Sequence, residues 1–284
     1  MTSSTSPFVI AIDAGTTGVR SRAVFPGGSG ETVASYREFT QHFPEPGQVE
    51  HDATEIWEAI RATLLDVIEQ VGTPAAIGIT NQRETVVAWN RRTGEPYGRA
   101  IVWQDRRTAG RCDELAAAGH LPRVREVTGL VLDPYFSGTK AAWMLQHRDI
   151  PVDDDLAIGT IDAWLVWNLT GGEVLATDPS NASRTMLFDI RRMTWSAEMC
   201  ELLGVPMAAL PEVKPSKNRL SRPGWSASLE NRRSPRAASP GWKLASDIGW
   251  PGAKWPAGTK GTIAASTRAT ASSTSSVSGA REGA

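Results

Sequence analysis

The sequence predicts a mixed α/β fold in which helices cover a β-sheet. Three observations support this prediction. The N-terminal part contains short apolar runs typical of strands, residues 52–71 carry apolar side chains at helical spacing, and strand and helix signals alternate up to residue 216. The chain has 284 residues, of which 40% are hydrophobic, so it can bury a sizeable core.

The N-terminal part predicts an antiparallel meander. Phe8–Ile12 is an apolar run that ends at Asp13 and the turn residue Gly15, and Arg20–Phe25 and Thr32–Phe39 predict two further strands. Glycines 27, 28 and 30 predict the turn between the second and third strands.

A long helix is predicted next. Asp52 and Glu55 are spaced like a capping box. The apolar residues that follow lie on one stripe, namely Ile56, Ile60, Leu64, Val67 and Val71. Further strands are predicted at Ala75–Thr80, Thr85–Asn90 and Ala100–Gln104, and further helices at Thr108–Ala118, Thr139–Arg148, Ile161–Leu169 and Ser196–Leu203.

Composition narrows the function classes. The net charge of −1 argues against a dedicated nucleic-acid binder. No apolar run reaches the length of a membrane helix, and no basic segment precedes the first apolar stretch. The two cysteines cannot form a disulfide framework, and the four histidines show no metal-ligand spacing. We therefore expect a cytoplasmic protein.

The composition changes abruptly near residue 216. Residues 217–284 carry 11 basic and 3 acidic side chains, whereas residues 1–216 carry 19 and 28. The C-terminal segment has only six Leu, Ile or Val residues and is rich in Ser, Ala, Gly, Thr and Pro. Such a segment buries too little apolar area to offset its ordering entropy. We expect one α/β domain over residues 1–216 and a disordered, low-complexity basic tail over 217–284.

The hairpin Asp13-Ala-Gly-Thr-Thr-Gly18 is a candidate phosphate site. Its backbone amides and the hydroxyls of Thr16 and Thr17 can hold a phosphate, Asp13 can hold Mg²⁺ through water, and Arg20 can neutralise phosphoryl charge. An ordinary glycine-rich hairpin is the alternative. The chain has no P-loop motif and no Rossmann fingerprint.

Three further motifs fit a polyol pocket. Arg83 and Glu84 follow a predicted strand, and together they can donate to and accept from hydroxyl groups. Trp103 ends another strand and can pack on the carbon side of a small polyol, and Tyr135 offers a phenol. A solvated loop, a core tryptophan and plain turn chemistry are the respective alternatives.

These blocks taken together resemble the FGGY carbohydrate kinases, and among them those acting on glycerol. The resemblance runs in order through AIDAGTTGVRSRAVF, AAIGITNQRET, AIVWQDRRTA, TGLVLDPYFSGTK and SNASRTMLF. It implies an actin/hexokinase-like (ribonuclease H-like) ATPase fold, of which residues 1–216 would be the first of two domains.

The resemblance also implies ligands and residue roles. The implied reaction is phosphorylation of glycerol by ATP with Mg²⁺, in an enzyme class that is often homo-oligomeric. Arg83, Glu84, Trp103 and Tyr135 would bind glycerol. The hairpin residues Thr16, Thr17 and Arg20 would face the nucleotide phosphates, with Asp13 near Mg²⁺.

One family motif is absent. The GDQQ block, which carries the aspartate general base, occurs nowhere in the chain. The loss of resemblance near residue 216, with its change of charge, favours a reading-frame shift. We therefore expect no catalytic base and no turnover by these 284 residues. The alternatives are a non-catalytic polyol-binding fragment or pseudogene product, and another FGGY sugar kinase.

Overall fold

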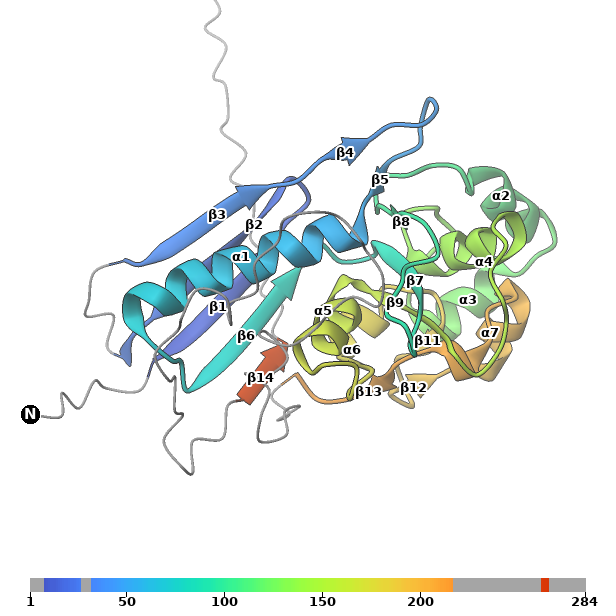
Figure 1. The fold of residues 1–284 in the computed structure, drawn as a ribbon. Helices are drawn as coiled ribbons and strands as arrows, with labels where there is room; N and C mark the ends of the chain where they lie inside the picture. Colours follow the sequence, from blue (N-terminus) through green and yellow to red (C-terminus); the bar gives the residue numbers. More distant parts are fainter. Residues whose placement is uncertain (1–7, 27–31, 217–261, 266–284) are drawn as a thin grey trace, which may run out of the picture.

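The computed structural model describes residues 8–26 and 32–216, together with the backbone of residues 262–265 (Figure 1). A sheet with strand order β14-β6-β1-β2-β3 forms one end of the molecule. Its strands are β1 (Val9–Ala14), β2 (Gly18–Val24), β3 (Ala34–Glu38), β6 (Ala76–Asn81) and β14 (Thr262–Ala265). The first three form the predicted antiparallel meander, and β6 and β14 add to it in parallel.

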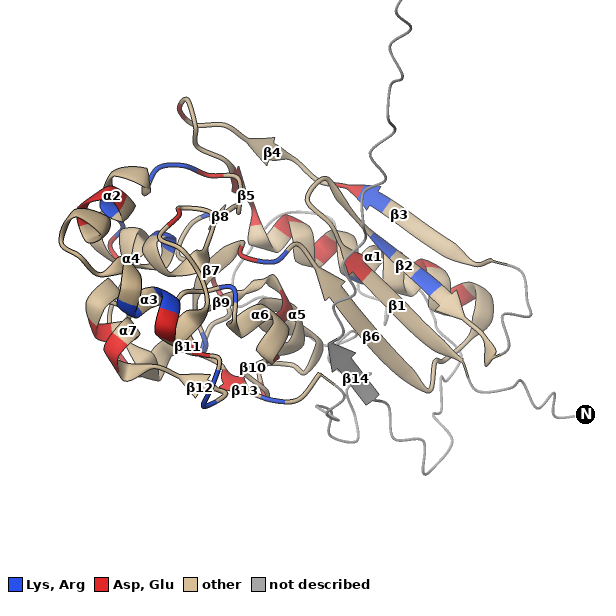
Figure 2. Cartoon of the chain, turned by 180° about the vertical axis from the view of Figure 1, so that it is seen from behind, with Lys and Arg blue, Asp and Glu red and all other residues tan. Residues whose placement is uncertain are grey.

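Helix α1 (Ala53–Val71) lies across one face of this sheet, as predicted. The Asp52 carboxylate caps it by accepting hydrogen bonds from the amides of Thr54 and Glu55. Ile10 and Ile12 of β1 are fully buried in this core. Acidic residues line α1, and basic residues lie on β2 and β3 (Figure 2).

A second five-stranded sheet, with order β4-β5-β8-β7-β9, forms the other half. Its strands are β4 (Gln41–His42), β5 (Glu50–His51), β7 (Val86–Asn90), β8 (Ala100–Ile101) and β9 (Leu156–Thr160). The helices of this half are α2 (Ala109–Ala117), α3 (Leu121–Thr128), α4 (Ser137–His147) and α7 (Ala197–Leu203). Apolar side chains from this sheet and from α2, α3, α4 and α7 form a second core.

Helix α5 (Ile161–Leu169) connects the two halves, and all of its residues are buried. Trp164 packs edge-on against Trp89 of β7, and its indole donates to the carbonyl of Ala53 at the start of α1. The remaining elements are α6 (Pro179–Ala182), the 3₁₀ turn Met207–Ala209, and two small ribbons that pair β10 (Ala176–Thr177) with β13 (Glu212–Val213) and β11 (Phe188–Asp189) with β12 (Thr194–Trp195).

The structure differs from the sequence expectations in a few places. The strand expected at Ala100–Gln104 ends at Ile101, because the chain turns there and the Asp105 amide bonds the Val102 carbonyl. Helix α3 and strand β9 were not predicted. Among the described residues, no helix is long and apolar enough to cross a bilayer.

The expectation of a disordered tail falls mostly outside the described residues, and the tail tryptophans also lie outside them, namely Trp225, Trp242, Trp250 and Trp255. The described part of that segment is β14, which pairs with β6 in parallel and forms one edge of the first sheet. The expected domain boundary at residue 216 stays a prediction.

Candidate functional site

The β1–β2 hairpin lies against the loop that follows β6. The backbone N–H of Gln82 donates to the Ala14 carbonyl, and the side-chain Nε2 of Gln82 donates to the Gly15 carbonyl. The Gln41 side chain donates to the Thr16 carbonyl at 2.9 Å. A Cβ at Gly18 would lie 2.6 Å from the Arg37 carbonyl oxygen, so the hairpin requires glycine there. These contacts hold the hairpin backbone in one position.

Glu84 has a strained backbone and a buried carboxylate. Its φ is +64°, in the left-handed region that residues other than glycine seldom adopt. Its side chain is 2% exposed, and Oε1 accepts a hydrogen bond from Arg184 Nε at 2.6 Å. The Ser137 hydroxyl, in the first turn of α4, donates to the Glu84 carbonyl. Strain of this kind is common at functional sites, where surrounding contacts hold it in place.

Trp103 joins the hairpin to the rest of the site. Its indole Nε1 donates to Thr16 Oγ1 at 3.1 Å. Its ring centroid lies 5.4 Å from that of Tyr135, with the planes tilted by 57°. The Trp103 amide donates to the Thr85 hydroxyl, next to Glu84. The structure thus brings together residues that are far apart in the sequence, from the hairpin, the loop after β6, the turn after β8 and the start of α4.

Arg184 is a site residue that the sequence analysis did not single out. Besides its bond to Glu84, its guanidinium lies over the Phe136 ring at 4.9 Å and the Tyr135 ring at 5.8 Å. Its side chain is 28% exposed, so it is partly open to solvent. The only available signal was its place in the SNASRTMLF block, because Arg184 is 100 residues from its partner.

Other predicted residues lie at the edge of this group. Asp13 and Arg20 face each other across β1 and β2, and both are exposed, as is Thr17. The Arg20 guanidinium lies over the Tyr36 ring at 5.3 Å. Arg83 is half-buried, and its side chain makes no hydrogen bond to any residue that the structure describes.

The residues present fit a water-mediated Mg²⁺ site better than a caged one. In the described part of the chain, no group of three His, Cys, Asp or Glu side chains is placed to hold a metal ion. Asp13 offers one exposed carboxylate beside a hairpin with two threonine hydroxyls. Mg²⁺ usually keeps several waters and binds one or two carboxylates together with substrate phosphates, so this arrangement suits an ion that arrives with a nucleotide.

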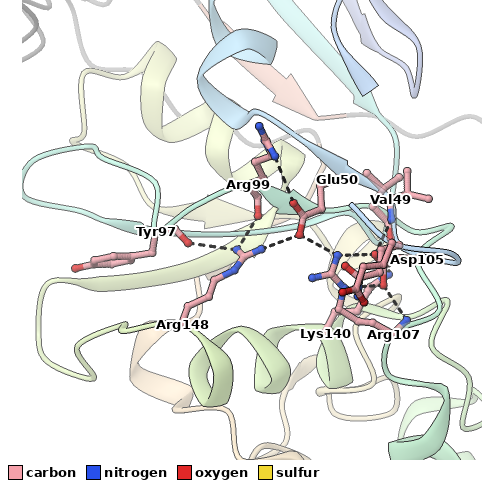
Figure 3. Close-up of polar contacts among 11 residues, drawn as sticks. Val49, Glu50, Tyr97, Arg99, Asp105, Arg107, Lys140 and Arg148 are labelled. Carbon is pink, nitrogen blue, oxygen red and sulfur yellow. Dashed lines mark hydrogen bonds and ion pairs between the residues drawn. The ribbon is translucent and has the colours of Figure 1, made fainter. Parts of the chain in front are cut away.

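A buried charge network supports the turn after Trp103 (Figure 3). Asp105 is fully buried and accepts from the Val49 amide at 2.7 Å and from Arg107 Nη2 at 2.8 Å. Arg107 and Arg148 also donate to Glu50. Burial opposes the charge of Arg107, but its bonds to Asp105 and Glu50 outweigh burial and raise the guanidinium pKa. Asp105 and Arg107 of the WQDRR motif are therefore both paired inside the protein.

A buried histidine lies behind the hairpin. His51 is fully buried, and Gln82 Nε2, which also donates to Gly15, lies 3.3 Å from its Nδ1. Burial, with a smaller contribution from His42, lowers the His51 pKa to about 4. His51 is therefore neutral at pH 7, and its Nδ1 can accept from Gln82.

The meander sheet with helix α1 on one face is the architecture of the first domain of an actin/hexokinase-like fold. A family description of the N-terminal domain of the FGGY carbohydrate kinases matches residues 8–222. The chain belongs to the FGGY family.

Curated relatives and solved structures agree with this assignment. A glycerol kinase from Dechloromonas aromatica is 52% identical over 223 residues, and one from Thermus thermophilus is 50% identical over 218. Each alignment covers about three quarters of this chain (75% and 74%) but only 44% of the relative. The chain thus spans less than half the length of the curated relatives it matches.

Among solved structures, Plasmodium falciparum glycerol kinase with ADP matches at a TM-score of 0.72 and 31% identity, covering 76% of this chain and 44% of that one. A gluconate kinase from Lactobacillus acidophilus matches at 0.70 with 20% identity, over 81% and 46% of the two chains, which shows the shared fold.

Proposed function

We propose that this chain carries the polyol-binding half of an ATP-dependent glycerol kinase, and that these 284 residues bind glycerol without phosphorylating it. The observation that carries the proposal is the meeting of Glu84, Trp103 and Tyr135 beside the β1–β2 hairpin. The identity of about 50% with named glycerol kinases supports glycerol over a longer sugar.

The proposed roles follow from the chemistry of each side chain. Glu84 accepts from a glycerol hydroxyl, and Arg83 donates to one. The rings of Trp103 and Tyr135 form an apolar wall for the carbon side of the polyol. Arg184 holds the Glu84 carboxylate in place through its hydrogen bond to Oε1.

The hairpin faces the nucleotide in this proposal. The Thr16 and Thr17 hydroxyls and the Arg20 guanidinium bind phosphate oxygens, and Asp13 holds Mg²⁺ through water. Mg²⁺ supplies neutralisation of the phosphate charge when it is bound. The hydrogen bond from the Trp103 indole to Thr16 supports a polyol wall next to a phosphate-binding hairpin.

Turnover also needs a group that takes the hydroxyl proton. The family motif that carries this aspartate does not occur in these 284 residues. Lack of a general base typically costs about 10²–10⁴ in rate.

Calorimetric titration with glycerol, xylulose and gluconate tests the polyol site. We expect glycerol to bind best, and Glu84→Gln to weaken binding about tenfold or more, because a hydrogen bond to a charged acceptor is lost. Glu212→Gln is the matched control, since Glu212 is an exposed carboxylate paired with Lys214.

An assay of glycerol 3-phosphate formation with Mg·ATP tests the catalytic part, and we expect no product above background.

The outcomes that would contradict the proposal are distinct. Equal glycerol affinity of Glu84→Gln and the parent would refute the polyol site. Tighter binding of xylulose or gluconate would favour a different FGGY kinase. Turnover that Glu84→Gln abolishes would show that the tail supplies a base.

A further inference from the structure

Lys140 is a fully buried lysine in the first turns of α4. Its ammonium donates to the carbonyl oxygens of Tyr135 at 2.8 Å and Val102 at 3.3 Å. Figure 3 shows its side chain beside the cluster of Asp105 and Arg107. No carboxylate of the described residues lies within ion-pair distance of its Nζ, so the hydrogen bonds of this charge go to main-chain oxygens.

The two carbonyls belong to the segments that carry the aromatic wall. One is the carbonyl of Tyr135 itself, and the other belongs to Val102, which directly precedes Trp103. The first turn of α4 also reaches Glu84 through the Ser137 hydroxyl. A single helix end therefore contacts all three segments on which the proposed polyol pocket depends.

Neither Asp105 nor Glu84 needs the Lys140 charge as an ion-pair partner, because Asp105 pairs with Arg107 and Glu84 pairs with Arg184. The buried Asp105 carboxylate already accepts from the Val49 amide and from Arg107. Burying an ammonium costs several kcal/mol, and an apolar residue of similar size commonly replaces a buried charge without loss of stability. What an apolar residue cannot supply is a donor that bonds two carbonyls from different segments at once.

We propose that Lys140 is a positioning residue that ties the Trp103 segment to the Tyr135 segment and so sets the spacing of the polyol wall. The inference rests on the proposed function for its ligand, because the wall has meaning only if a polyol binds there. The tie itself is a property of the fold and has a readout that needs no ligand.

The environment of the ammonium makes this tie sensitive to pH. Burial lowers the Lys140 pKa to about 7, against the opposing effect of the carboxylates of Asp105, Glu84 and Asp133 and with a smaller contribution from Arg107 in the same direction as burial. Hydrogen bonds from a charged donor are roughly twice as strong as those from a neutral one. Deprotonation therefore weakens both bonds without removing the side chain.

The experiment compares the parent chain with Lys140→Met, and uses Lys214→Met as a matched control at the lysine paired with Glu212. Proteins are labelled with 5-fluorotryptophan, and Trp103→Phe assigns the Trp103 fluorine signal among the 11 tryptophans. We expect the Trp103 signal to titrate with a midpoint near pH 7 in the parent and in Lys214→Met, and to stay constant in Lys140→Met. We also expect glycerol affinity to fall about tenfold in Lys140→Met, as for the loss of one or two buried hydrogen bonds.

The outcomes separate the two proposals. A parent chain that does not bind glycerol, but whose Trp103 signal titrates only when Lys140 is present, would refute the proposed function and support the tie. A Trp103 signal and a glycerol affinity that are both unchanged in Lys140→Met would overturn the tie. If Lys140→Met fails to fold, the parent titration decides alone, and a Trp103 signal that does not move between about pH 6 and pH 9 overturns the inference.

Discussion

Replacing His51 with glutamine removes a buried base that must stay neutral for the fold to keep its contacts. The imidazole is fully buried between the Phe39 ring, at 4.9 Å between centroids, and the side chain of Gln82. A proton on Nδ1 would face the amide donor of Gln82, which also holds Gly15 of the hairpin. Unfolding frees the imidazole to take up a proton in water.

The magnitude follows from the two pKa values. The His51 pKa falls from 6.5 in the unfolded chain to about 4 in the fold, because burial disfavours the charged form. The unfolded state therefore binds more protons between these two pH values. The contribution of His51 to the free energy of unfolding is complete above pH 6.5 and decreases as the pH falls toward 4. The limiting loss is about 3.4 kcal/mol, of which about 2.5 kcal/mol lies between roughly pH 7 and pH 4.5.

The assay is urea unfolding of the parent chain and His51→Gln from about pH 4.5 to pH 7, with the difference taken at each pH. The difference is needed because Asp162 acts in the opposite direction. Burial raises the Asp162 pKa to about 6, so its contribution to stability decreases as the pH rises from 3.8. We expect the parent to gain about 2.5 kcal/mol over the variant across this range.

His147→Gln is the control, since His147 is exposed and stacks on Trp143 at the surface. The difference in free energy of unfolding between His147→Gln and the parent should stay constant across this pH range. A difference between the parent and His51→Gln that does not change with pH would refute the reasoning, because it would mean that the buried imidazole is not held neutral.

Three further predictions concern packing and capping. Gly138→Ala should lower the free energy of unfolding by about 1–3 kcal/mol, because its Cβ would lie 2.5 Å from the Thr185 carbonyl oxygen. At Gly110 an added Cβ would meet nothing within 4 Å, so Gly110→Ala should raise the free energy of unfolding by up to about 1 kcal/mol. Equal urea midpoints for Gly138→Ala and Gly110→Ala would contradict this pair of predictions. Asp52→Ala should cost about 1 kcal/mol through loss of the α1 cap, measured the same way, and an unchanged midpoint would mean the cap contributes nothing.

The sequence predicts most of the fold because its strongest signals are local. Asp52 and Ser196 begin helices at the predicted places, and Gly204 ends α7 in the left-handed conformation. The signals fail where local pattern is weak. Helix α3 is short and has few apolar residues. Strand β9 is a short apolar run, and periodicity alone does not distinguish a strand from a buried helix in such a run.

The candidate site was predictable only in part, because its geometry depends on long-range contacts. The motifs indicate Glu84, Trp103 and Tyr135, and the structure brings them together around residues that no local pattern marks. Arg184 meets Glu84 from 100 positions away. Lys140 reads in the sequence as an ordinary helix residue, and only its burial and its two carbonyl partners distinguish it.

The left-handed backbone at Glu84 has an evolutionary consequence. A residue other than glycine in that conformation costs of order 1–3 kcal/mol, which glycine or asparagine would largely relieve. A library screened only for folded, protease-resistant protein should therefore enrich glycine and asparagine at position 84 over glutamate. Such enrichment would mark Glu84 as a residue that selection for stability alone discards, and only selection for ligand binding would keep it.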